Sequence, residues 1–265
     1  MSGESSEFKE ENLTVLGGQL TMRTSGSGDP LLILHGELGF PGWMNYHQEL
    51  SKRYKVMAPS HPGYDESDRL DWAMKVSDLA GAYLQLLDQI DVPNIRLMGF
   101  SMGAWLAAEM AVMDPGKFSR LVLVGPMGVK PEEGEIYDLF LNLAPDFLEE
   151  SFLDPQSVKE YSVIRPDEPS AEQEELWEVG REQSARLAWK PYMYNQTLPY
   201  LLGRLKRLQT LIVAGKQDSI VPIDSFRIYN ESIPGSKLSL IDQSGHRPEI
   251  ENMEEFLKVT TNFLK

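Results

Sequence analysis

The pentapeptide Gly99-Phe-Ser-Met-Gly103 constrains this chain more than any other stretch of its sequence. The short apolar run at residues 94–98 predicts a buried strand before it, and the helix formers of residues 104–113 predict a helix after it. A serine held in a sharp turn needs small neighbours, because a Cβ at either glycine would collide with the adjoining strand or helix. We therefore expect the hydroxyl of Ser101 to stand clear of a sheet, at the N-terminus of the helix.

Strands and helices alternate along most of the chain, which predicts an α/β protein with a mostly parallel, eight-stranded sheet flanked by helices. Residues 12–24 predict a hairpin centred on Gly17-Gly18. Further strands are expected at residues 31–34, 55–58, 94–98, 121–124, 210–214 and 237–241. Helices are expected at residues 43–53, 74–90, 104–113, 223–233 and 249–264.

The alternation stops at Met127 and resumes near residue 206. Between them the apolar periodicity is helical, prolines interrupt it repeatedly, and no convincing strand is present. We interpret residues 128–205 as a helical cap inserted after the sixth strand, and residues 1–127 and 206–265 as the core domain.

The net charge of −15 is concentrated in this insertion, because residues 130–182 hold 16 acidic and four basic residues. The charges indicate a solvated helical surface or, alternatively, a negative field over an entrance that disfavours anionic ligands. Nucleic acid and anionic membranes are poor partners for such a chain, so we expect a small-molecule ester as the partner. Monomer and homodimer remain open.

Cysteine is absent, which excludes disulfides, zinc–thiolate sites and a thiol nucleophile. No apolar run is long enough to span a membrane, and the acidic N-terminus lacks the features of a signal peptide. We expect a cytoplasmic protein without metal or cofactor.

A serine hydroxyl needs a base to become a nucleophile, and the base needs an acid that fixes its tautomer. Among the four histidines, His246 follows the strand at residues 237–241 and is the predicted base. Asp218 follows the strand at residues 210–214 and is the predicted acid. His35 is expected to brace a turn, and His47 to lie on the surface. His61 is expected to support a loop or, alternatively, to touch substrate.

The developing oxyanion needs two backbone N–H donors. We predict the amide of Met102, directly after the nucleophile, and the amide of Glu37, with Leu38 as the alternative. For the Glu37 side chain we favour a solvent contact or a salt bridge over a second carboxylate near the site.

Aromatic residues near Ser101 and in the insertion predict an apolar substrate pocket, with core packing as the alternative role for each of them. The predicted substrate-binding residues are Trp43, Phe100 and Trp105 near the pentapeptide, and Phe140 and Trp189 from the cap. Tyr137, Trp177 and Tyr192 are further cap aromatics that could join them.

The sequence resembles the α/β-hydrolase superfamily over almost its whole length. The resemblance is carried by His35-Gly36, His61-Pro-Gly63, the pentapeptide, Gly215-Lys-Gln-Asp218 and Gly245-His246-Arg-Pro-Glu-Ile-Glu251. It implies an α/β-hydrolase fold with Ser101, Asp218 and His246 as nucleophile, acid and base. Gly-Phe-Ser-Met-Gly is similar to small bacterial esterases and cofactor-free perhydrolases. The cap placement is similar to that of meta-cleavage-product hydrolases, which typically have Trp where this chain has Arg247.

Three functions follow as hypotheses. The first is a serine carboxylesterase acting on small, neutral, largely apolar esters through an acyl-enzyme on Ser101. The second is a carbon–carbon bond hydrolase, which would need a cap cation facing the site, with Arg165, Arg181 and Arg186 as candidates. The third is a non-catalytic small-ligand-binding protein of hydrolase ancestry.

Overall fold

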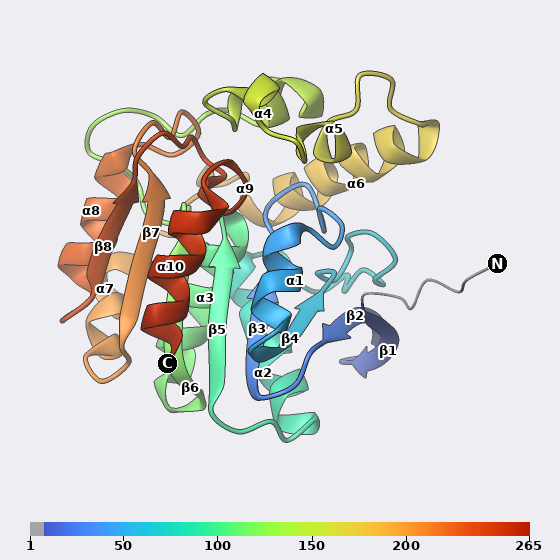
Figure 1. Ribbon diagram of the computed structural model, residues 1–265. Coiled ribbons are helices and arrows are strands. Elements are labelled where there is room, and N and C mark those ends of the chain that lie inside the picture. The colour runs from blue at the N-terminus through green and yellow to red at the C-terminus, as the bar shows by residue number, and fades with distance from the viewer. Residues whose placement is uncertain (1–7) are drawn as a thin grey trace.

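The computed structural model describes residues 8–265, and its centre is an eight-stranded sheet with the order β1-β2-β4-β3-β5-β6-β7-β8 (Figure 1). The strands are β1 (Lys9–Val15), β2 (Gly18–Ser25), β3 (Asp29–Leu34), β4 (Tyr54–Pro59), β5 (Ile95–Phe100), β6 (Phe118–Val124), β7 (Thr210–Gly215) and β8 (Lys237–Ile241). Strand β2 is antiparallel to β1 and β4, and the remaining neighbours pair in parallel. The predicted mostly parallel sheet is confirmed. Residues 1–7, part of the acidic stretch used to argue against a signal peptide, lie outside the described residues.

The hairpin of β1 and β2 turns one residue earlier than predicted. Gly18 already pairs with Val15, so the turn consists of Leu16 and Gly17. Both have positive φ, 45° and 92°, as the tight turns that suit the twist of a hairpin require.

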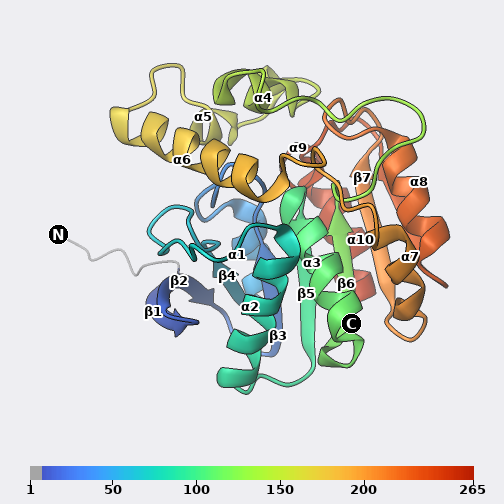
Figure 2. The same cartoon turned by 180° about the vertical axis from the view of Figure 1, so that it is seen from behind.

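Helices cover both faces of the sheet (Figure 2). The helices are α1 (Asn45–Ser51), α2 (Val76–Gln89), α3 (Met102–Met113), α4 (Ala144–Glu150), α5 (Tyr161–Ile164), α6 (Ala171–Ala188), α7 (Leu198–Leu202), α8 (Ile223–Ser232), α9 (Pro248–Glu251) and α10 (Met253–Leu264). Helices α1 and α10 pack together on one face, while α2, α3, α7 and α8 form a continuous layer on the other. The helix predicted over 249–264 is divided into α9 and α10, because Asn252 leaves the helical region at φ −135° and ψ 59°.

The alternation of side chains along the strands divides the core into two apolar layers. On β3, Leu31 and Ile33 pack in the layer beneath α1 and α10, with Phe256. Leu32 and Leu34 pack in the layer beneath α2 and α3, with Trp105. This division decides below which aromatic residues can reach the candidate site.

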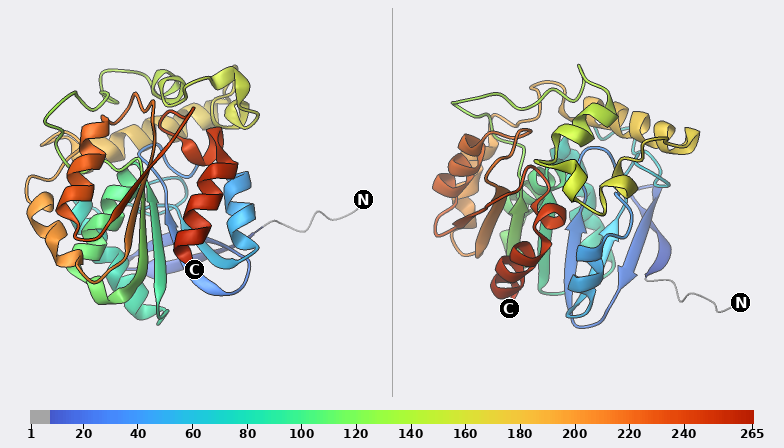
Figure 3. Two further views of the ribbon diagram at one scale, coloured as in Figure 1. Left: turned by 60° about the vertical axis from the view of Figure 1, so that its left-hand side comes forward. Right: turned by 45° about the horizontal axis from the view of Figure 1, so that its top comes forward.

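Between β6 and β7 the chain forms helices α4 to α7, with an isolated bridge between Gly128 and Tyr194 in place of any strand. Helices α4, α5 and α6 lie above the carboxyl ends of the parallel strands (Figures 1 and 3). We call residues 144–188, which contain these three helices, the cap segment. Helix α7 instead packs against α3 and α8 beside the sheet. The division into a core domain and a cap domain of residues 128–205 stays a prediction.

Across residues 8–265, no helix is both long enough and apolar enough to cross a membrane.

Candidate active site

Ser101 stands in a strained turn between β5 and α3. Its φ of 52° and ψ of −116° lie outside the regions that ordinary residues occupy. A Cβ on Gly99 would lie 2.2 Å from the carbonyl oxygen of Gly103, and a Cβ on Gly103 would lie 2.2 Å from that of His35. Both glycines are therefore required for β3, β5 and α3 to approach one another around the serine.

A hydrogen-bonded chain connects Ser101, His246 and Asp218, the three side chains predicted to act together. The Oγ of Ser101 lies 2.9 Å from Nε2 of His246, and Nδ1 of His246 lies 2.8 Å from Oδ2 of Asp218. The side chains of His246 and Asp218 are almost fully buried. The geometry allows Nδ1–H to donate to the carboxylate, which leaves Nε2 to accept the serine proton.

Asp218 is held by the loop that carries it. Its Oδ1 accepts hydrogen bonds from the amides of Ile220 and Val221, both at 2.9 Å, so that Oδ2 is left for the histidine. Burial alone would lower the pKa of His246, but the Asp218 carboxylate, with a further contribution from Glu37, raises this pKa above its ordinary value of 6.5.

Two buried histidines brace the loop after β3, which bears the predicted oxyanion amide. The amide of His61 donates to Nε2 of His35 over 2.8 Å, and Nε2–H of His61 donates to the carbonyl of His35 over 3.0 Å. The hydroxyl of Tyr83 donates to Nδ1 of His61 over 2.6 Å. Burial lowers the pKa of both imidazoles, that of His35 to about 3. The structural roles predicted for these two histidines agree with this arrangement.

Helix α6 of the cap segment fastens the same loop from the other side. The Ser184 hydroxyl donates to the carbonyl oxygen of Glu37 over 2.7 Å. The Tyr64 hydroxyl lies 2.9 Å from the Ser184 oxygen, within the same buried network. The position of the Glu37 backbone is thus set by contacts from the core and from the cap segment together.

The side chain of Glu37 corrects one of our expectations. It is only 1% exposed and forms no ion pair among residues 8–265, so both favoured roles, solvent contact and salt bridge, were wrong. Its Oε2 atom lies 3.5 Å from the amide nitrogen of Met102, the other predicted oxyanion donor. Glu37 is the second carboxylate at the site.

His47 was also placed wrongly, because it is buried and not on the surface. Its Nδ1 accepts the amide of Met44 over 3.1 Å at the start of α1, and its ring stacks on Trp43 at 5.0 Å between centroids. Because His47 caps the start of α1, its imidazole is buried. The helical spacing of the sequence does not indicate this burial.

Two cavities share part of their lining, and Ser101 borders the smaller one. A space of about 30 Å³, enough for roughly two water molecules, is bordered by Ser101 and His246. A second cavity, of about 380 Å³, is lined in part by residues of the cap segment. Gly36, Glu37, Phe100, Arg247 and Glu249 border both spaces. The two spaces are therefore neighbours, separated from each other at most by these shared residues.

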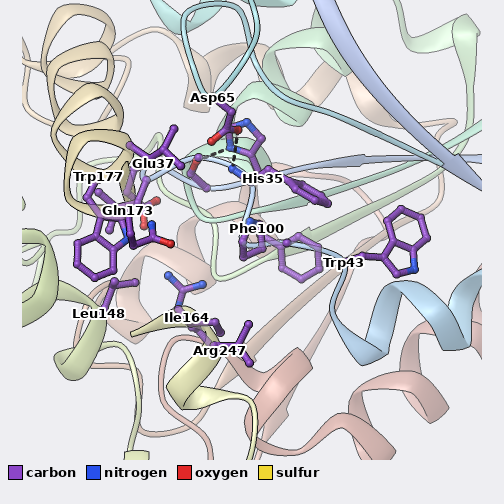
Figure 4. Close-up of a pocket in the computed structure, with 18 of the residues that line it drawn as sticks. His35, Glu37, Trp43, Asp65, Phe100, Leu148, Ile164, Gln173, Trp177 and Arg247 are labelled. Carbon is purple, nitrogen blue, oxygen red and sulfur yellow. Dashed lines mark hydrogen bonds between the residues drawn. The ribbon is translucent and has the colours of Figure 1, made fainter. Parts of the chain in front are cut away.

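Of the predicted substrate-binding residues, Trp43 and Phe100 line the larger cavity (Figure 4). Trp105, Phe140 and Trp189 do not, and the first two pack with the apolar layer beneath α2 and α3. Trp105 packs in the layer beneath α2 and donates to Glu109 over 3.0 Å. Phe140 and Trp189 pack on each other, 5.3 Å between centroids, and Trp189 is largely exposed.

The cavity lining includes Trp177, named above as a further cap aromatic, and residues that the sequence did not indicate. Figure 4 shows Trp177 and Gln173 of α6 on the side of Glu37, with Arg247 and Ile164 across from them. Arg247 and Glu249 follow His246 within the same loop and α9. Their closeness in sequence to the predicted base was the one signal that could have identified them.

None of the three cap arginines suggested for a carbon–carbon hydrolase lines either cavity. Arg165 lies near Glu149 and Asp167, and Arg181 pairs with Glu178. Arg186 donates to the carbonyl oxygens of Leu70 and Asp71. Among the described residues, no group of three or more His, Asp or Glu side chains is arranged to hold a metal ion.

The family model described as the alpha/beta hydrolase family matches residues 31–259, which includes all of the elements that carry the site. The chain belongs to the alpha/beta hydrolase family. It is a hydrolase of that superfamily, and its sheet and flanking helices match that fold.

Curated relatives cover nearly the whole chain at low identity. A 2-hydroxy-6-oxo-2,4-heptadienoate hydrolase from Pseudomonas putida is 26% identical over 274 residues, with 95% of each chain covered. A 2-hydroxymuconate semialdehyde hydrolase from a Pseudomonas species is 25% identical over 257 residues, covering 94% of this chain and 91% of the relative.

Solved structures share the fold. Naproxen esterase from Bacillus subtilis superposes with a TM-score of 0.80 at 18% identity, over 97% of this chain and 92% of the esterase. A meta-cleavage product hydrolase from Pseudomonas fluorescens superposes with a TM-score of 0.78 at 21% identity, over 98% of each chain. The chain is thus similar in structure to hydrolases of both classes.

Proposed function

We propose that this alpha/beta hydrolase is a serine carboxylesterase that cleaves small, largely apolar esters carrying no negative charge. The observation that carries the proposal is the chain of hydrogen bonds from Ser101 through His246 to Asp218, at 2.9 and 2.8 Å, on a turn with positive φ. A serine that has both a base and an orienting acid is equipped for nucleophilic attack on a carbonyl carbon.

In the proposed mechanism, Nε2 of His246 takes the hydroxyl proton as Ser101 Oγ bonds to the carbonyl carbon. The amides of Met102 and Glu37 donate to the oxyanion that forms. The protonated histidine then gives its proton to the departing alcohol, which leaves an acyl-enzyme on the serine. Water, activated by the same histidine, releases the acid and restores the hydroxyl. Asp218 holds the imidazole in the required tautomer throughout.

The cavity supports the apolar part of the substrate class. Phe100, Trp43 and Trp177 line it, together with Leu148 and Ile164. The negative charge of the chain, concentrated in residues 130–182, opposes the approach of anionic substrates such as acyl-CoA.

A second candidate is hydrolysis of a carbon–carbon bond next to a ketone. The names of the relatives from Pseudomonas, which are hydrolases of ring-fission dienoates and of a muconate semialdehyde, support it. The positions of Arg165, Arg181 and Arg186 do not, since none of them borders the cavities near Ser101.

A series of p-nitrophenyl esters of increasing acyl length tests the proposal, with the wild type measured beside Ser101→Ala. We expect turnover that disappears in the variant and that falls once the acyl group outgrows the cavity. A coloured ring-fission dienoate, assayed in parallel, separates the two candidates.

Turnover of the dienoate with no hydrolysis of any ester would favour the carbon–carbon candidate. Binding without turnover of either substrate class, unchanged in Ser101→Ala, would favour a ligand-binding protein. A higher kcat/KM on acyl-CoA than on short uncharged esters would contradict the proposed charge preference.

A further inference from the structure

The space at the serine contains more charged groups than the proposed reaction uses. Besides Ser101 and His246, it is bordered by Glu37, Arg247 and Glu249. Glu37 and Glu249 are 1% and 4% exposed, respectively. Buried carboxyl groups are costly to keep without partners, so two of them beside a nucleophile call for an explanation.

Glu249 lacks a partner for one of its oxygens. Its Oε2 atom is buried and accepts no hydrogen bond within residues 8–265. Burial raises the pKa of this carboxyl to about 7, although Arg247 lowers it. An unpartnered oxygen that borders the space at Ser101 is positioned to accept a hydrogen bond from a ligand.

Glu37 occupies the region where the oxyanion is expected. Its Oε2 lies 3.5 Å from the Met102 amide, the predicted donor to the substrate carbonyl oxygen. A carboxylate there competes with the carbonyl for the N–H group and repels the negative charge of the tetrahedral intermediate. A substrate that draws this carboxylate toward itself removes both penalties.

The charge beside the serine depends on Glu249, because Glu37 and Arg247 carry opposite charges and the pKa of Glu249 is about 7. Arg247 is the one cation among Glu37, Arg247 and Glu249, and its guanidinium lies 5.8 Å from the ring centre of Phe152. The charged groups of the larger cavity are satisfied elsewhere: Arg23 pairs with Glu10 and Glu66, and Asp65 accepts hydrogen bonds from Phe40 and Ser60. A cationic group on the ligand would favour the ionised form of Glu249 and balance its charge.

We propose that the site takes acyl groups bearing a protonated amine on the carbon next to the scissile carbonyl, and that Glu37 and Glu249 bind this ammonium. The inference rests on the proposed ester hydrolysis and names its substrate class as esters of α-amino acids. The ammonium draws the Glu37 carboxylate from the Met102 amide, which then donates to the carbonyl oxygen. A second N–H of the ammonium would donate to the unpartnered Oε2 of Glu249.

Two p-nitrophenyl esters of equal size test this. The ester of alanine carries an ammonium where the ester of 2-methylpropanoic acid carries a methyl group. Both are assayed across a pH series that spans the pKa of the substrate's amine, and each kcat/KM is divided by the rate constant for spontaneous hydrolysis of that ester. We expect wild-type kcat/KM to be about 10- to 100-fold higher for the alanine ester.

The variants Glu37→Gln and Glu249→Gln keep the side-chain shape and remove the charge. Each is expected to reduce the ratio of the two kcat/KM values by about 10-fold. Hydrolysis of the 2-methylpropanoic ester by the same preparation shows that the variant is folded and active. Glu254→Gln, an exposed glutamate on α10, is the matched control and leaves the ratio unchanged.

A wild-type ratio of one or below overturns the inference and leaves ester hydrolysis intact. If neither ester is hydrolysed, the proposed function fails, and binding still decides the inference. Calorimetry on Ser101→Ala then compares the binding of alaninamide with that of 2-methylpropanamide. The ammonium site is supported if alaninamide binds more tightly and if this difference disappears in the double variant Ser101→Ala, Glu249→Gln. Equal or weaker binding of alaninamide overturns it.

Discussion

The turn around Ser101 and the cap segment contribute to the site in different ways. At the turn, the proposed chemistry depends on atoms in direct contact, namely the hydrogen bonds of His246 to Ser101 and Asp218. The cap segment contributes packing, with Trp177 lining the cavity and Ser184 bonding to the Glu37 carbonyl. Its arginines pair with cap acids or bond to carbonyl groups away from the cavity. Reactivity should therefore depend on the core, and access and alignment on the cap.

The largest effect is expected at the nucleophile. Ser101→Ala removes the attacking oxygen and should lower kcat on a p-nitrophenyl ester on the order of 10⁴- to 10⁶-fold. Arg165→Gln, in the cap segment and away from the cavities, is the matched comparison and should leave kcat within about twofold. If kcat fell by similar factors in the two variants, reactivity would not depend on the core alone, and the proposed difference between the turn and the cap segment would be wrong.

The turn should also be intolerant of added volume. Gly103→Ala places a Cβ 2.2 Å from the carbonyl oxygen of His35, so backbone must move. We expect the free energy of unfolding to fall by about 3 kcal/mol or more, measured by urea denaturation. Gly203→Ala, where a Cβ meets nothing within 4 Å, provides the control and should change stability by less than about 1 kcal/mol.

A smaller effect is expected where the cap segment meets the core. Ser184→Ala removes the hydrogen bond to the Glu37 carbonyl and loosens the loop that bears the predicted oxyanion amide. We expect kcat to fall about 10-fold with little change in KM, because alignment of the donor matters most in the transition state. Ser157→Ala, an exposed serine of the cap segment, should leave both constants unchanged. An effect on KM alone would assign Ser184 to substrate binding.

The pH profile tests whether the Glu37 carboxylate acts on the base, His246. His246 must be neutral to accept the serine proton, and its pKa is raised, so kcat/KM should fall as the pH drops through a midpoint above 6.5. Glu37→Gln removes a negative charge that stabilises the imidazolium and should move this midpoint to lower pH. Glu254→Gln should not move it. A midpoint that stays in place in Glu37→Gln would show that the Glu37 charge does not act on the base.

Predictions from sequence succeeded where a local pattern requires one backbone geometry. A strand, a Gly-x-Ser-x-Gly pentapeptide and a helix in succession predict a sharp turn in which the residues beside the serine must be small. The structure has that turn. The parallel strands then bring the loops after β5, β7 and β8 to one edge, so Ser101, Asp218 and His246 converge although they are far apart in the chain. Their catalytic roles stay predictions until the variants are measured.

Tertiary packing decided what periodicity could not. Trp105 and Phe140 pack on one side of the sheet, away from the cavity that Trp43 and Phe100 line. All four are aromatic residues near the pentapeptide or in the insertion, so the sequence did not distinguish them. The backbone of Glu37 is held by a hydrogen bond from Ser184 of α6, which is more than 130 residues away in sequence. The sequence by itself determined the family, the sheet and the reactive turn, because these follow from local backbone rules. Which side chains surround the substrate was decided only by the fold, because that depends on contacts between distant segments.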